Sequence, residues 1–507
     1  MEILEGTIFI CTSPALCYGL KELADKLPKN CLIYLCEFDN ELQDFSKNTS
    51  LYIQNKELSE NKIIIFPTVQ ELYNLPLEIF DKAQTGVYKR VIRIDFSGGC
   101  QFTPDLYKQL EDACINSVKT FWTNRLTLTK FGRKYSYNFY KNLKIICKTT
   151  PITSYFNKVE KPILIVGAGK SVDSLYDKIY DIKDNFFILC VDTIMSSLLA
   201  KNIIPDGVFV EEAQAVISKA FICKKYDIQL FSGLSSLPLL SQYFSKANIS
   251  FFTTEYTKAN FIENLKNKNL LPPVNPPFGS VGLTTVYYGL KFRKDTTIPI
   301  YITGLDFSYS TGYTHGKGTL AHKTRLINNN RLIPIENYNA AFAPSAIKFY
   351  DKNNNIFITT PALSNYCNLF NNLFCSEKNI YDISNCGIKL AIERKSLNDI
   401  NNCQKNLTKT KSSVKNEEII KSEFSEEYKI KLNNYIQNEI KEIKELKSLL
   451  SEDNNLSKSE LKELITKLAI NKEYLYLHFP DGYQFTYSQS FLNRIRTEID
   501  FFLKIFE

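Results

Sequence analysis

The sequence has few of the residues that build metal centres. It contains only three histidines, His315, His322 and His478, among its 507 residues. Its 13 cysteines are scattered, without a CxxC pair or a compact group of cysteine and histidine. A site with several histidine ligands is therefore difficult to build, and the cysteines are expected to be reduced thiols. We expect no metal site.

Long hydrophobic runs are missing as well. No stretch approaches 18 consecutive apolar residues, and the best candidate, 186–200, is interrupted by Asp192, so we expect no membrane span. Met1 is followed by a short strand-like run rather than by a basic segment, a long apolar stretch and a small-residue cleavage site. The sequence therefore predicts a cytoplasmic protein without a signal peptide.

The net charge of +8 is not concentrated in a recognition motif, because acidic and basic residues are interleaved. The basic excess is clearest in a Lys/Asn/Ser-rich stretch, 395–422. We interpret this stretch as a solvated linker, since charge runs are more often solvated than bound to nucleic acid. No zinc finger, ribonucleoprotein sequence or Arg/aromatic array is present, and we expect no nucleic-acid partner.

Short apolar runs alternate with helical patterns over most of the chain, which predicts an α/β fold. The strand candidates in the first part are 7–11, 31–36, 62–67 and 90–94. Those in the second part are 163–166, 186–191, 207–210, 228–231, 249–252 and 298–303. Such continuously apolar strands favour a mostly parallel sheet that is covered on both faces, with ligands beyond the carboxyl ends of the strands.

Helical patterns dominate the C-terminal part, at 424–450, 457–469 and 491–506, and a capping-box sequence opens the second of these. Another helical segment, 106–143, precedes the second group of strands. We therefore divide the chain into an N-terminal α/β domain (1–150), a central α/β domain (151–394), a linker (395–422) and a helical C-terminal domain (423–507).

A glycine-containing turn follows the strand candidate 163–166, and its sequence is Gly167-Ala-Gly-Lys-Ser171. Glycines allow a sharp turn close to a phosphate, and the start of a helix provides free N–H groups. The spacing is not that of a P-loop, and the third glycine of a dinucleotide fingerprint is absent. Nucleotide binding and a plain strand-to-helix turn are equally compatible with this motif alone.

A second motif, 275–282, leads into a helical run, so that Gly279 and Ser280 are expected at a helix start. This position suits an anion or a ribose, although Ser280 also fits a simple helix cap.

The richest motif follows the strand candidate 298–303. It places Asp306, Tyr309, Tyr313 and His315 in one loop, with His322 just beyond. Tyrosine hydroxyls can bond a departing phosphate, and a histidine can accept a proton near neutral pH. A buried structural histidine is the alternative for each one singly, but two of the three histidines fall in this short stretch.

In order and spacing, these motifs resemble the core of the Maf (motility accessory factor) glycosyltransferase family. The resemblance rests on GAGKSVD (167–173), VDT (191–193), IIPDGVFVEE (203–212), FGSVGLTT (278–285) and ITGLDFSYSTGYTHGKG (302–318). It extends over roughly residues 10–390. Lys170 replaces a proline of the family pattern, which suggests an added phosphate contact or altered donor handling. The resemblance implies a Rossmann-like core of mostly parallel strands, preceded by a smaller α/β domain and followed by a helical unit.

The family core is also similar to that of bacterial sialyltransferases, which implies inverting transfer of a nonulosonic acid of the pseudaminic, legionaminic or sialic type. The CMP-sugar donor would be a substrate, no cofactor would be required, and flagellin would be the protein acceptor. Tyr309 and Tyr313 would bond the leaving phosphate, and His315 or His322 would be the base. The implied nucleotide-binding residues are Gly167, Gly169, Lys170, Ser171, Asp192, Thr193, Glu212, Gly279, Ser280 and Asp306.

Two other functions remain open. The same core resembles 6-hydroxymethylpterin diphosphokinase, a Mg²⁺-dependent enzyme, and Asp192, Glu211, Glu212 and Asp306 could hold the metal. The large flanking domains argue against such a small metabolic kinase. The third possibility is a non-catalytic accessory protein for flagellin that would use the C-terminal helices as a partner surface.

Overall fold

The computed structural model describes residues 4–28, 30–49, 63–221, 226–310, 313–335, 344–351, 354–396, 422–451 and 457–506. The chain forms two compact units. The first unit consists of Met1–Arg133 and Glu452–Glu498, and the second of Lys134–Ser451 and Ile499–Glu507. Nearly all of the expected linker lies outside the described residues. The expected domain limits stay predictions.

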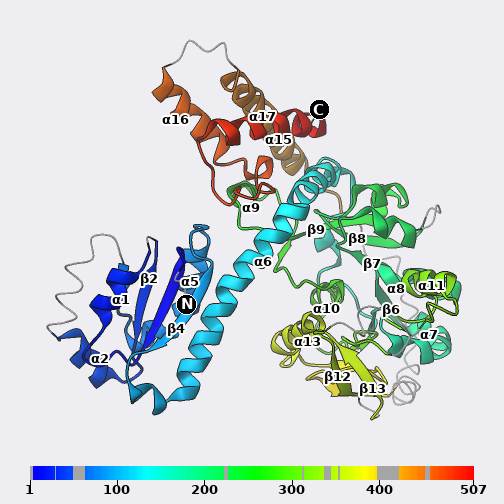
Figure 1. The fold of residues 1–507 in the computed structure, drawn as a ribbon. Helices are drawn as coiled ribbons and strands as arrows, with labels where there is room; N and C mark the ends of the chain where they lie inside the picture. The colour runs from blue at the N-terminus through cyan, green and yellow to red at the C-terminus, as the bar shows by residue number, and fades with distance from the viewer. Residues whose placement is uncertain are drawn as a thin grey trace. The chain divides into compact units, whose positions relative to one another are not determined.

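The first unit contains a parallel sheet of four strands in the order β3-β2-β1-β4 (Figure 1). Alternate residues of β1 contribute to two separate hydrophobic clusters, Ile8 and Ile10 to one and Phe9 and Cys11 to the other, as side chains on opposite faces of a strand must. The four expected strands are confirmed. The elements are β1 (Thr7–Thr12), α1 (Leu20–Lys26), β2 (Leu32–Cys36), α2 (Asn40–Lys47), β3 (Ile63–Ile65), α4 (Val69–Leu72), α5 (Leu75–Ala83) and β4 (Arg90–Asp95).

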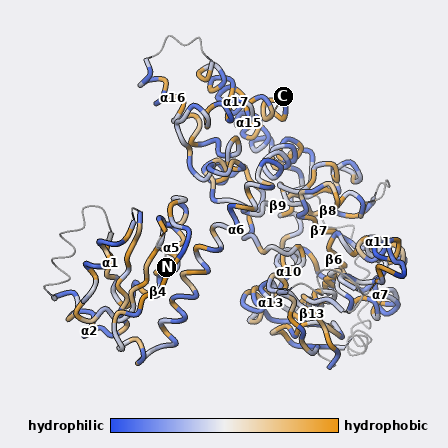
Figure 2. Tube along the Cα trace, viewed as in Figure 1, coloured by the Kyte–Doolittle hydropathy of each residue, from blue (hydrophilic) through white to orange (hydrophobic). Residues whose placement is uncertain are grey.

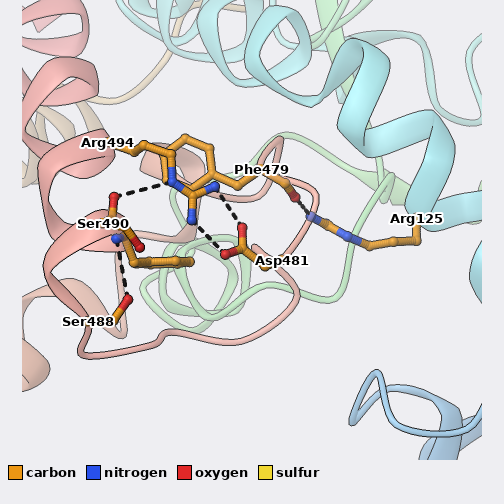
Figure 3. Close-up of polar contacts among 7 residues, drawn as sticks. Arg125, Phe479, Asp481, Ser488, Ser490 and Arg494 are labelled. Atoms are coloured by element: carbon orange, nitrogen blue, oxygen red, sulfur yellow. Dashed lines mark hydrogen bonds and ion pairs between the residues drawn. The ribbon is translucent and has the colours of Figure 1, made fainter. Parts of the chain in front are cut away.

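The long helix α6 (Pro104–Leu143) ties C-terminal residues to this first unit. Arg125 is only 5% exposed, and its guanidinium donates to the carbonyl oxygens of Leu477, at 2.7 Å, and of Phe479. Figure 3 shows the contact of Arg125 with Phe479 and, beside it, the ion pair between Arg494 and Asp481. This ion pair has two hydrogen bonds, of 2.8 and 2.6 Å. These contacts explain how segments that are far apart in the sequence form one unit.

The helical C-terminal region is confirmed. It contains α15 (Glu426–Leu449), α16 (Lys458–Ala469) and α17 (Gln489–Phe506). The expected capping box at Ser457 and Glu460 is present at the start of α16. Along the described residues, no helix combines the length and the apolar character that a membrane crossing needs.

The second unit is built on a sheet of nine strands in the order β10-β9-β8-β7-β6-β5-β11-β14-β15. Every pairing in it is parallel, which confirms the expected α/β core. The strands are β5 (Ile163–Val166), β6 (Phe187–Val191), β7 (Gly207–Val210), β8 (Gln229–Gly233), β9 (Ile249–Thr254), β10 (Val274–Asn275), β11 (Ile300–Thr303), β14 (Ile380–Asp382) and β15 (Glu393–Arg394).

Aromatic packing holds helix α10 (Val281–Phe292) against this sheet. Tyr288 of α10 stacks on Phe209 of β7 with ring centroids 5.8 Å apart, and Phe209 stacks on Phe231 of β8 at 4.7 Å. Gly289 allows the helix to lie close to Ile165 of β5. Figure 2 shows the hydrophobic and hydrophilic segments on the same view of the chain.

Other elements of the second unit are α7 (Tyr176–Ile182), α8 (Asp192–Ala200), α9 (Asn260–Asn267), α11 (Leu320–Asn328) and α13 (Pro361–Phe374). A separate antiparallel ribbon consists of β12 (Ile347–Tyr350) and β13 (Ile356–Thr359).

The strand order of the large sheet reverses between β5 and β11. After β5 the chain adds β6 through β10 on one side, and it then returns so that β11 pairs with the other side of β5. The connections on the two sides of such a point run in opposite directions, which leaves a crevice outside the carboxyl ends of the two strands. The crevice at β5 and β11 is therefore the first place to look for a ligand site.

Candidate active site

A pocket of about 250 Å³ lies at this crevice. Its walls come from the loops after β5, β6 and β11, from the start of α10, from the segment before α11 and from α13. The lining residues are Gly167, Ala168, Gly169, Val191, Asp192, Thr193, Ser280, Val281, Gly282, Gly304, Leu305, Asp306, Phe307, Ser308, Tyr309, Thr314, His315 and Leu363.

The glycines of the β5 loop allow it to pack directly on the β11 loop. Gly167 N–H donates to Thr303 O at 2.7 Å, and Gly169 N–H donates to Gly304 O at 2.8 Å. A Cβ on Gly167 would come within 2.3 Å of Gly304 O, and one on Gly169 within 2.5 Å of Asp306 Cγ. The close contact between the two loops therefore explains by itself why glycines are needed at these two positions.

Ser171 and Asp306 lock these loops together. Asp306 accepts hydrogen bonds from Ser171 N at 2.8 Å and from Ser171 Oγ at 2.5 Å, and Ser171 Oγ in turn accepts from Gly304 N at 3.0 Å. Ser171 is only 1% exposed. The hydroxyl that was expected at a phosphate thus lies inside the protein and supports the turn. A 3-10 turn, Lys170–Ser174, follows Gly169, and α7 begins only at Tyr176.

The start of α10 offers backbone N–H groups to the pocket. Ser280 occupies the N-cap position without a side-chain cap hydrogen bond, and Ser280, Val281 and Gly282 line the cavity. The first N–H groups of a helix have no partner within the helix and carry partial positive charge. This end of α10 can therefore bind an anion. Gly279 precedes it with φ of +72° and lies against Tyr366 rather than in the pocket wall.

Asp192 stands at the start of α8, where the β6 strand ends. Its Oδ1 accepts from Thr193 N at 2.6 Å and from Thr193 Oγ1 at 2.9 Å. Burial, together with the neighbouring carboxylates of Glu212 and Glu211, raises the pKa of Asp192 to about 6, although the hydrogen bonds from Thr193 act in the opposite direction. This carboxyl can therefore exchange a proton close to neutral pH.

His315 lines the pocket on a segment that is held over the β5 loop. Gly316 N–H donates to Ala168 O at 2.8 Å, and Lys317 N–H donates to Asp173 Oδ1 at 2.7 Å. His315 Nδ1 lies 3.1 Å from Thr314 Oγ1. Burial lowers the pKa of His315, and the nearby charge of Arg325 lowers it further. The imidazole is therefore neutral near pH 7, the form that can accept a proton.

Tyr309 is fixed in the pocket wall by backbone pairing with β13. Its N–H donates to Ile358 O at 2.7 Å, and its carbonyl accepts from Ile358 N at 2.9 Å. Burial raises the pKa of Tyr309, so its hydroxyl remains protonated and able to donate.

Tyr313 and His322 pack on each other beside the pocket and do not line it. Their rings are parallel within 13°, with centroids 5.2 Å apart, and Lys170 Nζ lies 5.2 Å from the Tyr313 ring centroid. His322 Nδ1 accepts from Gly318 N at 3.3 Å. Lys170 thus contacts an aromatic ring instead of standing in the cavity wall.

Glu212 lies outside the pocket wall, where its Oε1 accepts from Gln214 N at 2.8 Å. Both oxygens of the neighbouring Glu211 accept hydrogen bonds, from Thr254 at 2.5 Å and from Thr284 at 2.8 Å. Across the described part of the chain, no group of three or more His, Cys, Asp or Glu side chains is arranged to hold a metal ion. All four carboxylates considered for magnesium accept hydrogen bonds from protein donors, and in Glu211 and Asp306 both oxygens do so.

Eight of the fourteen residues that the sequence analysis named therefore line one pocket: Gly167, Gly169, Asp192, Thr193, Ser280, Asp306, Tyr309 and His315. Their roles stay predictions. The other ten lining residues were not predicted from the sequence; among them are the polar residues Ser308 and Thr314, and Leu363, which belongs to the unpredicted helix α13. The signal for that helix was present, since Thr360 caps it and Pro361 is its first residue.

Comparisons with known proteins agree with this architecture. Residues 137–312 match the model of the family described as 6-hydroxymethylpterin diphosphokinase MptE-like. An uncharacterized protein of Treponema pallidum (strain Nichols) is 28% identical over 526 aligned residues, which cover 100% of this chain and 88% of the relative.

Among solved structures, the chain is similar to a MAf glycosyltransferase from Magnetospirillum magneticum AMB-1. The TM-score is 0.58 at 13% identity, and the match covers 100% of this chain and 79% of that protein. The resemblance of the core to MptE-like and Maf proteins is confirmed, and the shared fold extends over the whole chain.

Proposed function

We propose that this chain is a cytoplasmic glycosyltransferase that transfers a nonulosonic acid of the pseudaminic, legionaminic or sialic type from a CMP donor to a Ser or Thr hydroxyl of flagellin. The observation that carries the proposal is the meeting of a free helix start, a tyrosine hydroxyl and a neutral histidine in one pocket at the switch point. The fold shared with a MAf glycosyltransferase supports it.

The first requirement of this reaction is to stabilise the departing CMP phosphate. In this proposal the N–H groups of Val281 and Gly282 at the start of α10 bind the phosphate, and the Tyr309 hydroxyl donates a further hydrogen bond; all three residues line the pocket. Donors that are aimed at charge developing in the transition state lower the barrier. In this proposal the phosphate charge is met by hydrogen-bond donors, and no metal ion or other cofactor is needed.

The second requirement is a base for the acceptor hydroxyl. His315 is neutral near pH 7 because its pKa is lowered, so it can take the proton while the acceptor oxygen attacks the anomeric carbon and the C–O bond to the phosphate breaks. Attack from the face opposite to the leaving CMP inverts the configuration. We assign the base to His315 rather than His322, because His315 lines the pocket and His322 is stacked on Tyr313 outside its wall.

The runner-up is a Mg²⁺-dependent diphosphokinase, which the match to the MptE-like family favours. That chemistry needs carboxylates that are available to a metal ion. Asp306 accepts hydrogen bonds from Ser171, and Glu211 accepts hydrogen bonds from two threonines. Reassigning them to a metal would break several buried hydrogen bonds, which makes this function the weaker proposal. A non-catalytic flagellin accessory protein would leave the convergence of Tyr309 and His315 in the pocket without a role.

Calorimetric titration with CMP and with ATP, each with and without Mg²⁺, separates these functions. We expect CMP to bind without Mg²⁺. The Ser280→Gly variant, which changes the N-cap, should bind CMP more weakly, whereas Ser218→Ala on a 3-10 turn should bind it normally. Binding of ATP only with Mg²⁺, and none of CMP, would replace this proposal with the diphosphokinase.

A transfer assay with a CMP-nonulosonic acid and purified flagellin then tests the chemistry. His315→Ala should lower the rate by roughly 10²–10⁴-fold, as expected for loss of a general base, and His322→Ala should have the smaller effect. If His315→Ala retains the wild-type rate, His315 is not the base.

A further inference from the structure

We propose that Ser308 is a donor-binding residue whose hydroxyl bonds the transferred sugar. This inference rests on the proposed function, because it assumes that a nucleotide-activated sugar occupies the pocket. Ser308 lines the pocket between Phe307 and Tyr309.

Among the residues that the structure describes, none forms a hydrogen bond with the buried Ser308 hydroxyl. The residue is 8% exposed, and within the described residues its Oγ has no hydrogen-bond partner and almost no solvent-accessible surface. Buried polar atoms in folded proteins are nearly always paired, and an exception needs an explanation. A ligand in the pocket that Ser308 lines supplies one.

The backbone on both sides of Ser308 is fixed. Phe307 has a left-handed conformation with φ of +48°, which is uncommon for a bulky residue, and its carbonyl accepts from Thr359 Oγ1 at 2.9 Å. Tyr309 is paired with Ile358 through two backbone hydrogen bonds. Only rotation about the Cα–Cβ bond is left to Ser308, so we infer that Oγ, which is buried in the structure, turns to another staggered position when it contacts a ligand.

The position of Ser308 in the sheet indicates which part of the donor it meets. The pocket extends from the β6 end, with Asp192 and Thr193, to the β11 end, with Ser308 and Tyr309, and β5 lies between these strands. In the proposed reaction Tyr309 bonds the leaving phosphate, so the bond to the sugar lies at the β11 end. The sugar carries hydroxyl, carboxylate and amide groups, any of which can pair with a serine hydroxyl.

The test compares two ligands on one variant. Equilibrium binding of CMP and of CMP-N-acetylneuraminic acid is measured for wild type, for Ser308→Ala and for the control Ser232→Ala, which removes a buried hydroxyl of β8 in the same unit. A neutral hydrogen bond corresponds to about a 3- to 10-fold change in affinity. We expect Ser308→Ala to weaken binding of the CMP-sugar by this factor and to leave CMP binding and the melting temperature unchanged.

The outcomes are distinguishable. If wild type binds both ligands and Ser308→Ala binds them as wild type does, or loses affinity for both equally, Ser308 does not contact the sugar and the inference is wrong while the proposed function stands. A lower melting temperature with unchanged affinities would assign the hydroxyl a structural partner and also overturn it. If wild type binds neither ligand, the proposed function fails and this inference fails with it.

Discussion

Replacing Ser171 by alanine separates a ligand contact from a structural one. The sequence motif predicts a hydroxyl that binds the nucleotide, whereas the structure places Ser171 Oγ between Asp306 Oδ1, at 2.5 Å, and Gly304 N, at 3.0 Å. Ser171→Ala removes the donor to the Asp306 carboxylate and leaves the Gly304 N–H without its acceptor. The backbone bond from Ser171 N to Asp306 Oδ2 remains.

The magnitude follows from these two contacts. A hydrogen bond to a charged group contributes about 1.5–3 kcal/mol, and an unsatisfied buried N–H costs about 1–3 kcal/mol. Partial relaxation and non-additivity lower the sum, so we expect a loss of about 3 kcal/mol. For a unit as large as the second one, this loss lowers the melting temperature by about 4 °C.

The assay is thermal unfolding of wild type and variant without any nucleotide, with Ser218→Ala as the control. Ser218 lies on a 3-10 turn, and its hydroxyl donates to the Ala215 carbonyl at 2.7 Å. A Ser171→Ala variant that melts with wild type but no longer binds CMP would refute the structural role and restore the ligand role. If Ser171 is structural, the variant should still bind CMP, and any loss of affinity should come only from the less stable β5 loop.

Three further predictions concern pH and the joining of distant segments. The pKa of His315 is lowered, so the transfer rate should be constant above about pH 7 and fall only below about pH 6.5, the ordinary pKa of a histidine. Initial rates across this range test this expectation, and a rate that rises in acid would contradict it. Burial raises the pKa of Asp192 to about 6. The protonated carboxyl therefore stabilises the folded protein in acid, and this stabilisation is lost as the pH rises through about 6. Near pH 7.5, Asp192→Asn should therefore melt at a higher temperature than wild type, and its free energy of unfolding should be higher by up to about 3 kcal/mol. This difference should shrink toward about pH 5. Equal differences at both pH values would show that the carboxyl keeps an ordinary pKa. Arg125→Ala removes two buried hydrogen bonds to the carbonyls of Leu477 and Phe479. This should lower the free energy of unfolding by about 3–5 kcal/mol and speed limited proteolysis between α16 and α17. Unchanged cleavage would show that this contact does not hold the segment.

The four strands of the small sheet and six of the nine strands of the large sheet were located from the sequence, because buried parallel strands are continuous apolar runs. The run 163–166 is β5 without any change of limits, and 186–191 differs from β6 by one residue. Two short strands at the ends of the large sheet, β10 and β15, have only two residues each, and β15 is exposed. Segments of this length carry no periodic signal, so they were not predicted.

Sequence order also located the strand ends that carry the pocket. Polar and glycine residues directly after β5, β6 and β11 were expected to lie together, since the carboxyl ends of parallel strands share one edge of the sheet. The sequence could not show which of these side chains face the cavity. Tyr313 and His322 were expected in the chemistry, but their rings pack on each other outside the pocket wall. Ring packing of this kind depends on where α11 lies, and residue spacing does not encode it.

The sequence by itself determined the α/β class, the parallel core, the helical C-terminal region and the loops in which ligand-binding residues could occur, because these follow from local hydrophobic patterns and turn residues. Only the tertiary structure decided which polar groups line the pocket and which ones hydrogen-bond to each other. Ser171 and Asp306 are separated by 135 positions in the sequence, yet they share a hydrogen bond of 2.5 Å. The reversal of strand order brings β11 back to β5, and that long-range pairing turns a suspected phosphate ligand into a support for the loop.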